Sequence, residues 1–131
     1  MKEITIAGVT YPVKSNALTR LHYKKLFGVG IFQDISKMSI ANNVQEELRA
    51  TLKEQGKTKK EIEEAVNNEM LKYTDDILDI AFRFAYVLIY TANPNFMTFE
   101  EWLSEESMNK IDFESGWIQE ATEYITSTFR G

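Results

Sequence analysis

The sequence predicts a mainly α fold, a small helical domain with an N-terminal two-stranded β-hairpin packed on a helical core. Three observations support this fold class. Residues 2–13 alternate apolar and polar side chains around Ala7-Gly8, which is typical of a hairpin. Residues 77–89 are apolar almost all round, as expected of a buried helix. The intervening and following segments repeat apolar residues at helical spacing.

Residues 2–13 predict the hairpin with a defined register. A turn at Ala7-Gly8 gives the cross-strand pairs Ile6 with Val9, Ile4 with Tyr11, and Lys2 with Val13. Successive side chains of a strand alternate between its faces, so the apolar residues of both strands share one face. Pro12 has no amide to donate and therefore belongs on an edge strand. A lone hairpin is marginal in water, so we expect this apolar face to dock on helices.

Residues 16–40 are expected to form helices. Asn16 or Ser15 is a suitable N-cap for the first helix, and Gly28 is a suitable residue to end it. Its apolar stripe is centred on His22 and contains Ala17, Leu18, Leu21 and Leu26, with Tyr23 and Phe27 at the margin. A second, short helix is expected to restart with Ile31, Phe32, Ile35 and Met38.

Residues 43–73 predict a charged helical hairpin, and residues 75–92 predict the buried central helix. The first is interrupted near Gly56 and resumes at a capping box of Thr58 and Glu61. The central helix ends at Asn93-Pro94, because the residue before a proline resists helical angles.

Residues 98–130 predict an acidic helical tail. A second capping box joins Thr98 and Glu101, and Met97 with Trp102 would form a hydrophobic staple. We expect a short helix to about Met108. A last amphipathic helix follows, with Trp117, Ile118, Ala121, Ile125 and Phe129 on one face. With no repeat or linker visible, residues 1–131 are expected to form a single domain.

Composition narrows the function classes. The 131 residues include no Cys and one His, so disulfides, thiolate metal sites and Cys nucleophiles are excluded. We expect no signal peptide and no membrane segment, and hence a cytoplasmic protein. The net charge is −5, where a nucleic-acid-binding protein would more often be basic. Residues 1–30 carry five basic side chains and one acidic, giving +4; residues 99–131 carry two basic and eight acidic, giving −6.

The sequence offers little to an enzyme. His22 has no orienting carboxylate at helical spacing, and general bases and metal sites both need partners. Asp75, Asp76 and Asp79 share one helix turn, but a helix N-terminus attracts carboxylates without any cation. Four glutamates at positions 100, 101, 105 and 106 lie among charged neighbours, which would not raise their pKa values for acid–base work. We therefore expect no catalysis, no cofactor and no metal.

Nucleic-acid binding is a lesser alternative. Lys57, Lys59 and Lys60 lie at the turn of the charged hairpin, as in a helix-turn-helix. Glu61, Glu63 and Glu64 follow at once and would be repelled by phosphates.

Four segments carry a resemblance to a known family. They are Tyr23-Lys24-Lys25-Leu26-Phe27-Gly28, Ile31-Phe32-Gln33-Asp34-Ile35, Phe99-Glu100-Glu101-Trp102-Leu103, and the acidic helix of residues 117–129. In this order, behind a small hairpin, they resemble the tail assembly chaperones of long-tailed (siphovirus-type) bacteriophages or prophages. The resemblance covers residues 1–37 and 75–131, and residues 43–73 look like a variable insertion. Ala7-Gly8 departs from the Asn-Gly turn that is common in such hairpins.

The resemblance implies a non-catalytic protein of viral tail assembly. Such chaperones bind the tape measure protein and keep it in solution while tail tube subunits polymerise around it. It further implies the cytoplasm of the bacterial host as the location, absence from the mature virion, and a possible longer, frameshifted form. Two other classes stay open: a structural virion component such as a minor tail or connector protein, and a small DNA-binding regulator.

Four residues are the candidates for partner binding. Trp117 and Phe129 on the last helix would supply apolar anchors, although a core role is also open for each. Lys24 and Lys25 belong to the basic start, which is complementary in charge to the acidic end. Contacts between copies through these surfaces would produce rings or open arrays. The competing interpretation is a contact within one chain.

Overall fold

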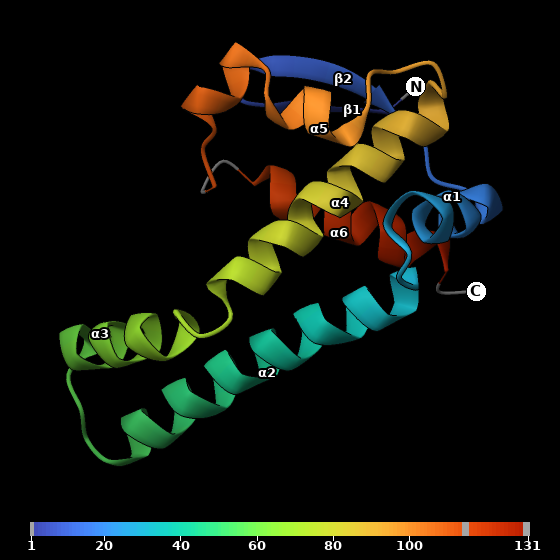
Figure 1. The fold of residues 1–131 in the computed structure, drawn as a ribbon. Helices are drawn as coiled ribbons and strands as arrows, with labels where there is room; N and C mark the ends of the chain where they lie inside the picture. The colour runs from blue at the N-terminus through green and yellow to red at the C-terminus, as the bar shows by residue number, and fades with distance from the viewer. Residues whose placement is uncertain (1, 114–115, 130–131) are drawn as a thin grey trace. The chain divides into compact units, whose positions relative to one another are not determined.

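The computed structural model describes residues 2–113 and 116–129 and confirms the mainly α fold with an N-terminal hairpin. Figure 1 shows its elements in order: β1 (Lys2–Ile6), β2 (Val9–Val13), α1 (Ala17–Phe27), α2 (Ile31–Glu54), α3 (Lys59–Met70), α4 (Thr74–Ala92), α5 (Phe99–Leu103), the 3-10 helix η1 (Glu106–Lys110) and α6 (Trp117–Thr128). The chain divides into two compact units. Unit 1 comprises residues 1–31 and 81–131, and unit 2 comprises residues 32–80. The single domain over residues 1–131 stays a prediction.

The hairpin has the predicted register. Ile6 pairs with Val9, Ile4 with Tyr11 and Lys2 with Val13. Ala7 and Gly8 have φ values of 54° and 79°, and two positive values are what a type I′ turn requires. Ala7 therefore adopts a conformation that costs a side chain some strain. On the predicted apolar face Ile4, Ile6, Tyr11 and Val13 are buried, but Val9, next to the turn, is 38% exposed.

The hairpin docks on helices of unit 1. The Lys14 amide, directly after β2, donates to the Leu88 carbonyl of α4 over 3.1 Å, and α6 contacts β1. The part of α4 within unit 1 is the core helix of that unit, because Ala81 and all residues from Phe84 to Ile89 are buried. This confirms the predicted central helix, which ends at Ala92 before Asn93-Pro94.

Helix α1 has the predicted ends but a different buried face. Asn16 caps it by accepting from the Leu18 amide at 2.8 Å, and Gly28 ends it with a φ of 73°. The prediction of a stripe centred on His22 is wrong: Thr19 and Tyr23 are fully buried, whereas Leu18 is 54% exposed.

Hydrogen bonding explains the buried threonine. The Thr19 hydroxyl accepts from the Asn16 amide at 3.0 Å and shares a hydrogen bond of 3.2 Å with the Thr91 hydroxyl. Tyr23 packs against Phe84 with ring centroids 5.9 Å apart, and its hydroxyl accepts from Arg83 Nε at 3.1 Å. Satisfied polar groups are cheap to bury, so counting apolar residues alone pointed to the wrong face.

The acidic tail begins as predicted and then departs from prediction. Thr98 and Glu101 form their reciprocal capping box, but α5 ends at Leu103 rather than near Met108. The Ser104 hydroxyl donates to the Glu100 carbonyl at 2.8 Å, and such a bond competes with helix continuation. In α6 the buried residues are Trp117, Ala121 and Ile125, as the amphipathic pattern predicts.

In residues 31–54, one continuous helix is present where two were predicted. Helix α2 runs without interruption from Ile31 to Glu54, through the break expected between residues 40 and 43. No Gly or Pro lies in this stretch, and Asn42-Asn43 cost a helix only a few tenths of a kcal/mol each (~0.5). Gly56 turns the chain with a φ of 76°. Helix α3 then opens with the predicted capping box of Thr58 and Glu61.

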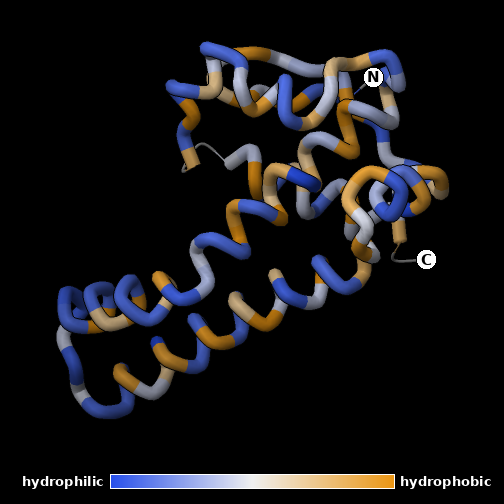
Figure 2. The backbone as a smooth tube through the Cα atoms, in the orientation of Figure 1, coloured by the Kyte–Doolittle hydropathy of each residue, from blue (hydrophilic) through white to orange (hydrophobic). Residues whose placement is uncertain are grey.

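Helices α2 and α3 lie side by side within unit 2. Arg49 and Glu63 form a bidentate ion pair between them, and Val66 is the buried apolar residue of α3. Hydrophilic residues dominate α3 in Figure 2. This arrangement confirms a charged helical hairpin, although its first helix begins earlier than predicted.

Candidate functional site

The four predicted partner-binding residues belong to α1 and to α6 or its end, and they differ in exposure. Trp117 begins α6 and is 1% exposed, whereas Phe129 follows the end of the same helix and is half-buried. Lys24 and Lys25 lie exposed in the last turn of α1. Trp117 is therefore a core residue and not a free apolar anchor, which corrects the first of the two interpretations left open for it.

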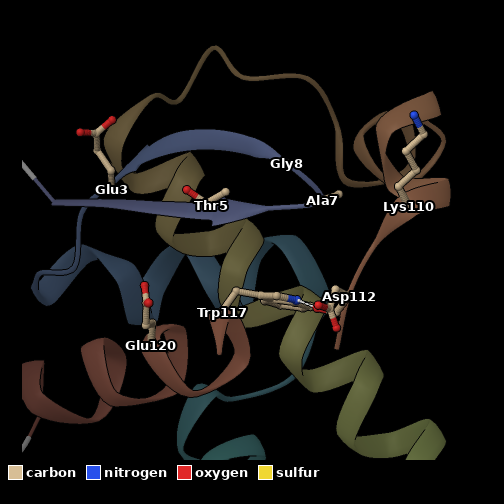
Figure 3. A pocket seen from close by; sticks show the side chains of 8 residues that line it. All are labelled: Glu3, Thr5, Ala7, Gly8, Lys110, Asp112, Trp117 and Glu120. Atoms are coloured by element: carbon tan, nitrogen blue, oxygen red, sulfur yellow. Dashed lines mark hydrogen bonds between the residues drawn. The ribbon is translucent and has the colours of Figure 1, made fainter. Parts of the chain in front are cut away.

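Trp117 instead lines a polar pocket of about 490 Å³ between the hairpin turn and the start of α6. In Figure 3 its indole Nε1 points at Asp112, and it donates to the Asp112 carbonyl oxygen at 2.8 Å. Glu3 of β1 and Glu120 of α6 add carboxylates to the lining. The indole is held by this bond and by Phe82, whose ring centroid lies 5.6 Å away.

A second pocket of unit 1, the aromatic pocket, has a volume of about 590 Å³. Its lining includes the rings of Phe27, Tyr86, Tyr90, Phe96 and Phe99. Tyr86 is buried, while the other four rings are half-buried. The centroid of Tyr86 lies between 5.3 and 6.2 Å from each of the other four centroids. Five rings thus meet around one partly open hollow.

Local bonds hold this pocket in shape. The Tyr86 hydroxyl donates to the Met97 carbonyl at 2.6 Å. Burial raises the pKa of Tyr86 above its ordinary value, and the nearby Tyr90 and Glu101 raise it further, so the phenol remains a donor at neutral pH. The Glu101 carboxylate accepts from the Thr98 amide at 3.0 Å. That bond lowers the pKa of Glu101.

Unit 2 has a basic pocket at the hairpin tip. It measures about 490 Å³ and is lined by Arg49, Lys53, Lys57, Lys59, Ile62 and Glu63. The hydrogen bond from Arg49 is the main cause that lowers the pKa of Glu63, so this carboxylate remains charged among the lysines. Its charge opposes phosphate binding at the same place.

A smaller apolar pocket of unit 2 measures about 160 Å³. Ile40, Ala41, Tyr73 and Ile77 line it, with Lys37 and Asp76 also present. Ile40 is 55% exposed, so the pocket opens beside an apolar side chain that faces solvent.

The surroundings of the residues considered for metal or acid–base chemistry do not form a metal site in the part of the chain that the structure describes. His22 packs edge-on against Tyr90 with centroids 5.0 Å apart. Across residues 2–113 and 116–129, no group of three or more His, Asp or Glu side chains is placed to hold a metal ion. Within the same residues, no helix has the length and apolar character needed to cross a membrane.

Comparison with known proteins finds no matching family model, no matching curated protein and no matching solved structure.

Sequence reasoning missed the aromatic pocket. Its signal was present, because seven of the residues from 82 to 102 are aromatic. Phe82 and Phe84 belong to the predicted buried helix and Trp102 to the predicted staple, and of these three Phe84 and Trp102 are buried. Only the fold shows that Phe99 contacts Phe27 of α1 and that Tyr90 and Phe96 line the same pocket.

Proposed function

We propose that this chain is a non-catalytic tail assembly chaperone that binds a tape measure protein and helps to recruit tail tube subunits. The observation that carries the proposal is the meeting of two motifs on which the family resemblance rests. Phe27, from Tyr23–Gly28, and Phe99, from the Phe99–Leu103 segment, have ring centroids 5.1 Å apart. Motifs separated by more than seventy residues in sequence thus form one cluster, which supports treating them as parts of one design.

The exposed apolar side chains of α1 supply a mode of binding. Leu18 and Leu21 are 54% and 51% exposed and lie three residues apart on one face. A helical partner segment is recognised through apolar anchors spaced about one turn apart. Isolated apolar residues are common on surfaces, but two on adjacent turns of one helix form a strip that a partner can cover.

The proposed function also includes self-association of the chain through charged side chains. Coating a long tape measure protein requires many copies, so we propose self-association in which the exposed Lys24 and Lys25 meet acidic side chains of another copy. Since exposed charges contribute register and encounter rate more than affinity, the tape measure protein would supply most of the apolar contact. The proposed location is the cytoplasm of the bacterial host, without incorporation into the virion.

Co-expression tests this function. Helical fragments of a tape measure protein are expressed alone and with this chain, and the fraction remaining in the supernatant is measured. We expect the chain to keep the fragments in solution and the Leu18→Glu/Leu21→Glu variant to lose this effect. Ile40→Glu/Leu71→Glu makes the same apolar-to-acidic change at two exposed aliphatic residues outside the family motifs; it is the matched control and should retain the effect. Equal precipitation with and without the chain would contradict the proposal.

A further inference from the structure

The aromatic pocket has a chemical character that its ring geometry defines. Four half-buried rings stand around the buried ring of Tyr86. Tyr86 and Tyr90 are stacked with an interplanar angle of 29°, whereas Phe27 and Phe99 meet edge to face at 75°. The ring planes around the hollow therefore differ in direction. An aromatic face carries the negative part of the ring quadrupole and attracts cations.

The charge at the pocket agrees with this preference. Glu100, at the start of α5, is the charged residue among those that line the hollow, and its side chain is exposed. Glu101 follows directly, and its carboxylate accepts at 3.0 Å from the amide of Thr98, a lining residue, so a second carboxylate lies near the hollow. Lys24 and Lys25 do not belong to the lining, and the Lys24 Nζ points to the Gly28 carbonyl at 3.4 Å.

We infer that the aromatic pocket binds an arginine or lysine side chain presented by a segment of a partner protein. The methylene stem of such a side chain would lie against the rings, and its charged group would lie over a ring face beside the Glu100 carboxylate. An anionic group would meet the negative ring faces and the same carboxylate, which disfavours it. This inference goes beyond the proposed function and does not require the partner to be a tape measure protein.

Two peptides that differ only in charge test the inference. Both are short, acetylated and amidated, with alanine and leucine flanking a central arginine in one and a central citrulline in the other. Citrulline keeps the shape of arginine but is neutral. Titrated into the isotopically labelled full chain and followed by amide chemical shifts, the arginine peptide should shift Phe27, Tyr90 and Phe99. The citrulline peptide should bind roughly 3- to 10-fold more weakly.

Variants on exposed or half-buried positions locate the effect. Glu100→Gln should bring the affinity of the arginine peptide down towards that of the citrulline peptide and leave the citrulline peptide nearly unchanged. Tyr90→Leu removes a ring of the lining and should weaken both peptides, the arginine peptide more. Glu105→Gln makes the same change of charge at an exposed glutamate outside the lining and should have no such effect. Equal binding of the two peptides, or shifts outside the pocket only, would overturn the inference.

Two further outcomes would also overturn it. Aromatic grooves bind polyproline segments as well, so a proline-rich peptide that occupied the pocket more tightly than the arginine peptide would identify a different ligand. If light scattering showed that the chain alone dimerises and that Glu100→Gln separates the dimer, the occupant would be a second copy rather than a partner. Loss of peptide binding would leave the co-expression result unaffected, so the two proposals can fail independently.

Discussion

Unit 1 and unit 2 both consist mainly of helices, but they bury very different side chains. The core of unit 1 contains large aromatic residues, among them Tyr23, Phe84, Tyr86, Trp102 and Trp117. All residues of unit 2 are described, and its buried apolar residues are Ala41, Val66 and Ile80. Apolar burial therefore contributes most of the stability of unit 1 and much less of that of unit 2.

In unit 2, interactions local to the helices must therefore contribute a larger part of the stability. Glu and Lys are frequent in α2 and α3, and both are good helix formers. A capping box opens α3, and the Arg49–Glu63 ion pair joins the two helices. Regions with few buried apolar contacts open at lower free energy than packed cores. We therefore expect the amides of α2 and α3 to exchange with solvent before those of α4 in unit 1.

The largest expected effect is that of removing the central ring of unit 1. Trp102 is fully buried, its Nε1 donates to the Tyr11 hydroxyl at 3.2 Å, and its ring contacts those of Phe82 and Tyr86. Trp102→Ala should lower the free energy of unfolding by about 3–5 kcal/mol, as for other aromatic truncations in cores. Urea unfolding followed by circular dichroism measures the change.

Its control separates ring packing from the hydrogen bond. Trp102→Phe retains an aromatic ring but leaves the Tyr11 hydroxyl without its partner, and should cost clearly less than Trp102→Ala. A loss below about 1 kcal/mol for Trp102→Ala would place it in the range of surface substitutions and remove the contrast between the units.

The matching substitution in unit 2 should have a smaller and more local effect. Val66 is 1% exposed, and Val66→Ala removes roughly two methylene equivalents, or about 1.5 kcal/mol. Native-state hydrogen exchange should show faster opening of α3, while the most protected amides of α4 in unit 1 change little. If exchange became equally faster throughout both units, the two units would unfold as one and not separately.

Much of this contrast could be predicted from the sequence, because periodicity reports burial well where a helix is wholly apolar or strongly amphipathic. Helix α4 and the face of α6 with Trp117, Ala121 and Ile125 are examples. The hairpin register followed from the alternation of side chains, and both threonine caps followed from their local sequence.

The failures have physical causes of their own. In α1 the buried face depends on bonds from Thr19 to Asn16 and Thr91, and Thr91 is distant in sequence. In α2 the expected break has no Gly or Pro to enforce it. The aromatic pocket was missed because Phe27 and Phe99 meet only through the tertiary fold. Local patterns cannot report contacts of this kind.

Each unit has a helix that begins with a Thr and Glu capping box, so the same substitution can be compared in the two units. Thr58 accepts from the Glu61 amide at 3.2 Å, and Thr98 accepts from the Glu101 amide at 3.2 Å. Thr→Ala at either position should cost about 1 kcal/mol of local helix stability. We expect Thr98→Ala to lower the urea midpoint of the whole transition and Thr58→Ala to act mainly on exchange in the first turn of α3. Serine at each position keeps the hydroxyl and should restore most of the loss; if serine is as harmful as alanine, the cap bond is not the cause.

The smallest expected effect is that of the Arg49–Glu63 ion pair, whose stabilising contribution should be lost at low pH. The hydrogen bond from Arg49 holds the pKa of Glu63 below its usual value. A carboxyl with a lowered pKa contributes stability above its unfolded pKa of about 4.3 and loses that contribution as pH falls through its lower folded pKa. Both side chains are substantially exposed, so salt screens the pair.

Arg49→Gln should therefore speed amide exchange in α3 slightly at pH 7 and low salt, and have no effect at pH 2 or in 1 M NaCl. Lys60→Gln removes an equal charge outside the hairpin-tip pocket and serves as the control. An Arg49→Gln effect that persists undiminished at pH 2 would show that the arginine stem, through packing, stabilises the hairpin and that the ion pair does not.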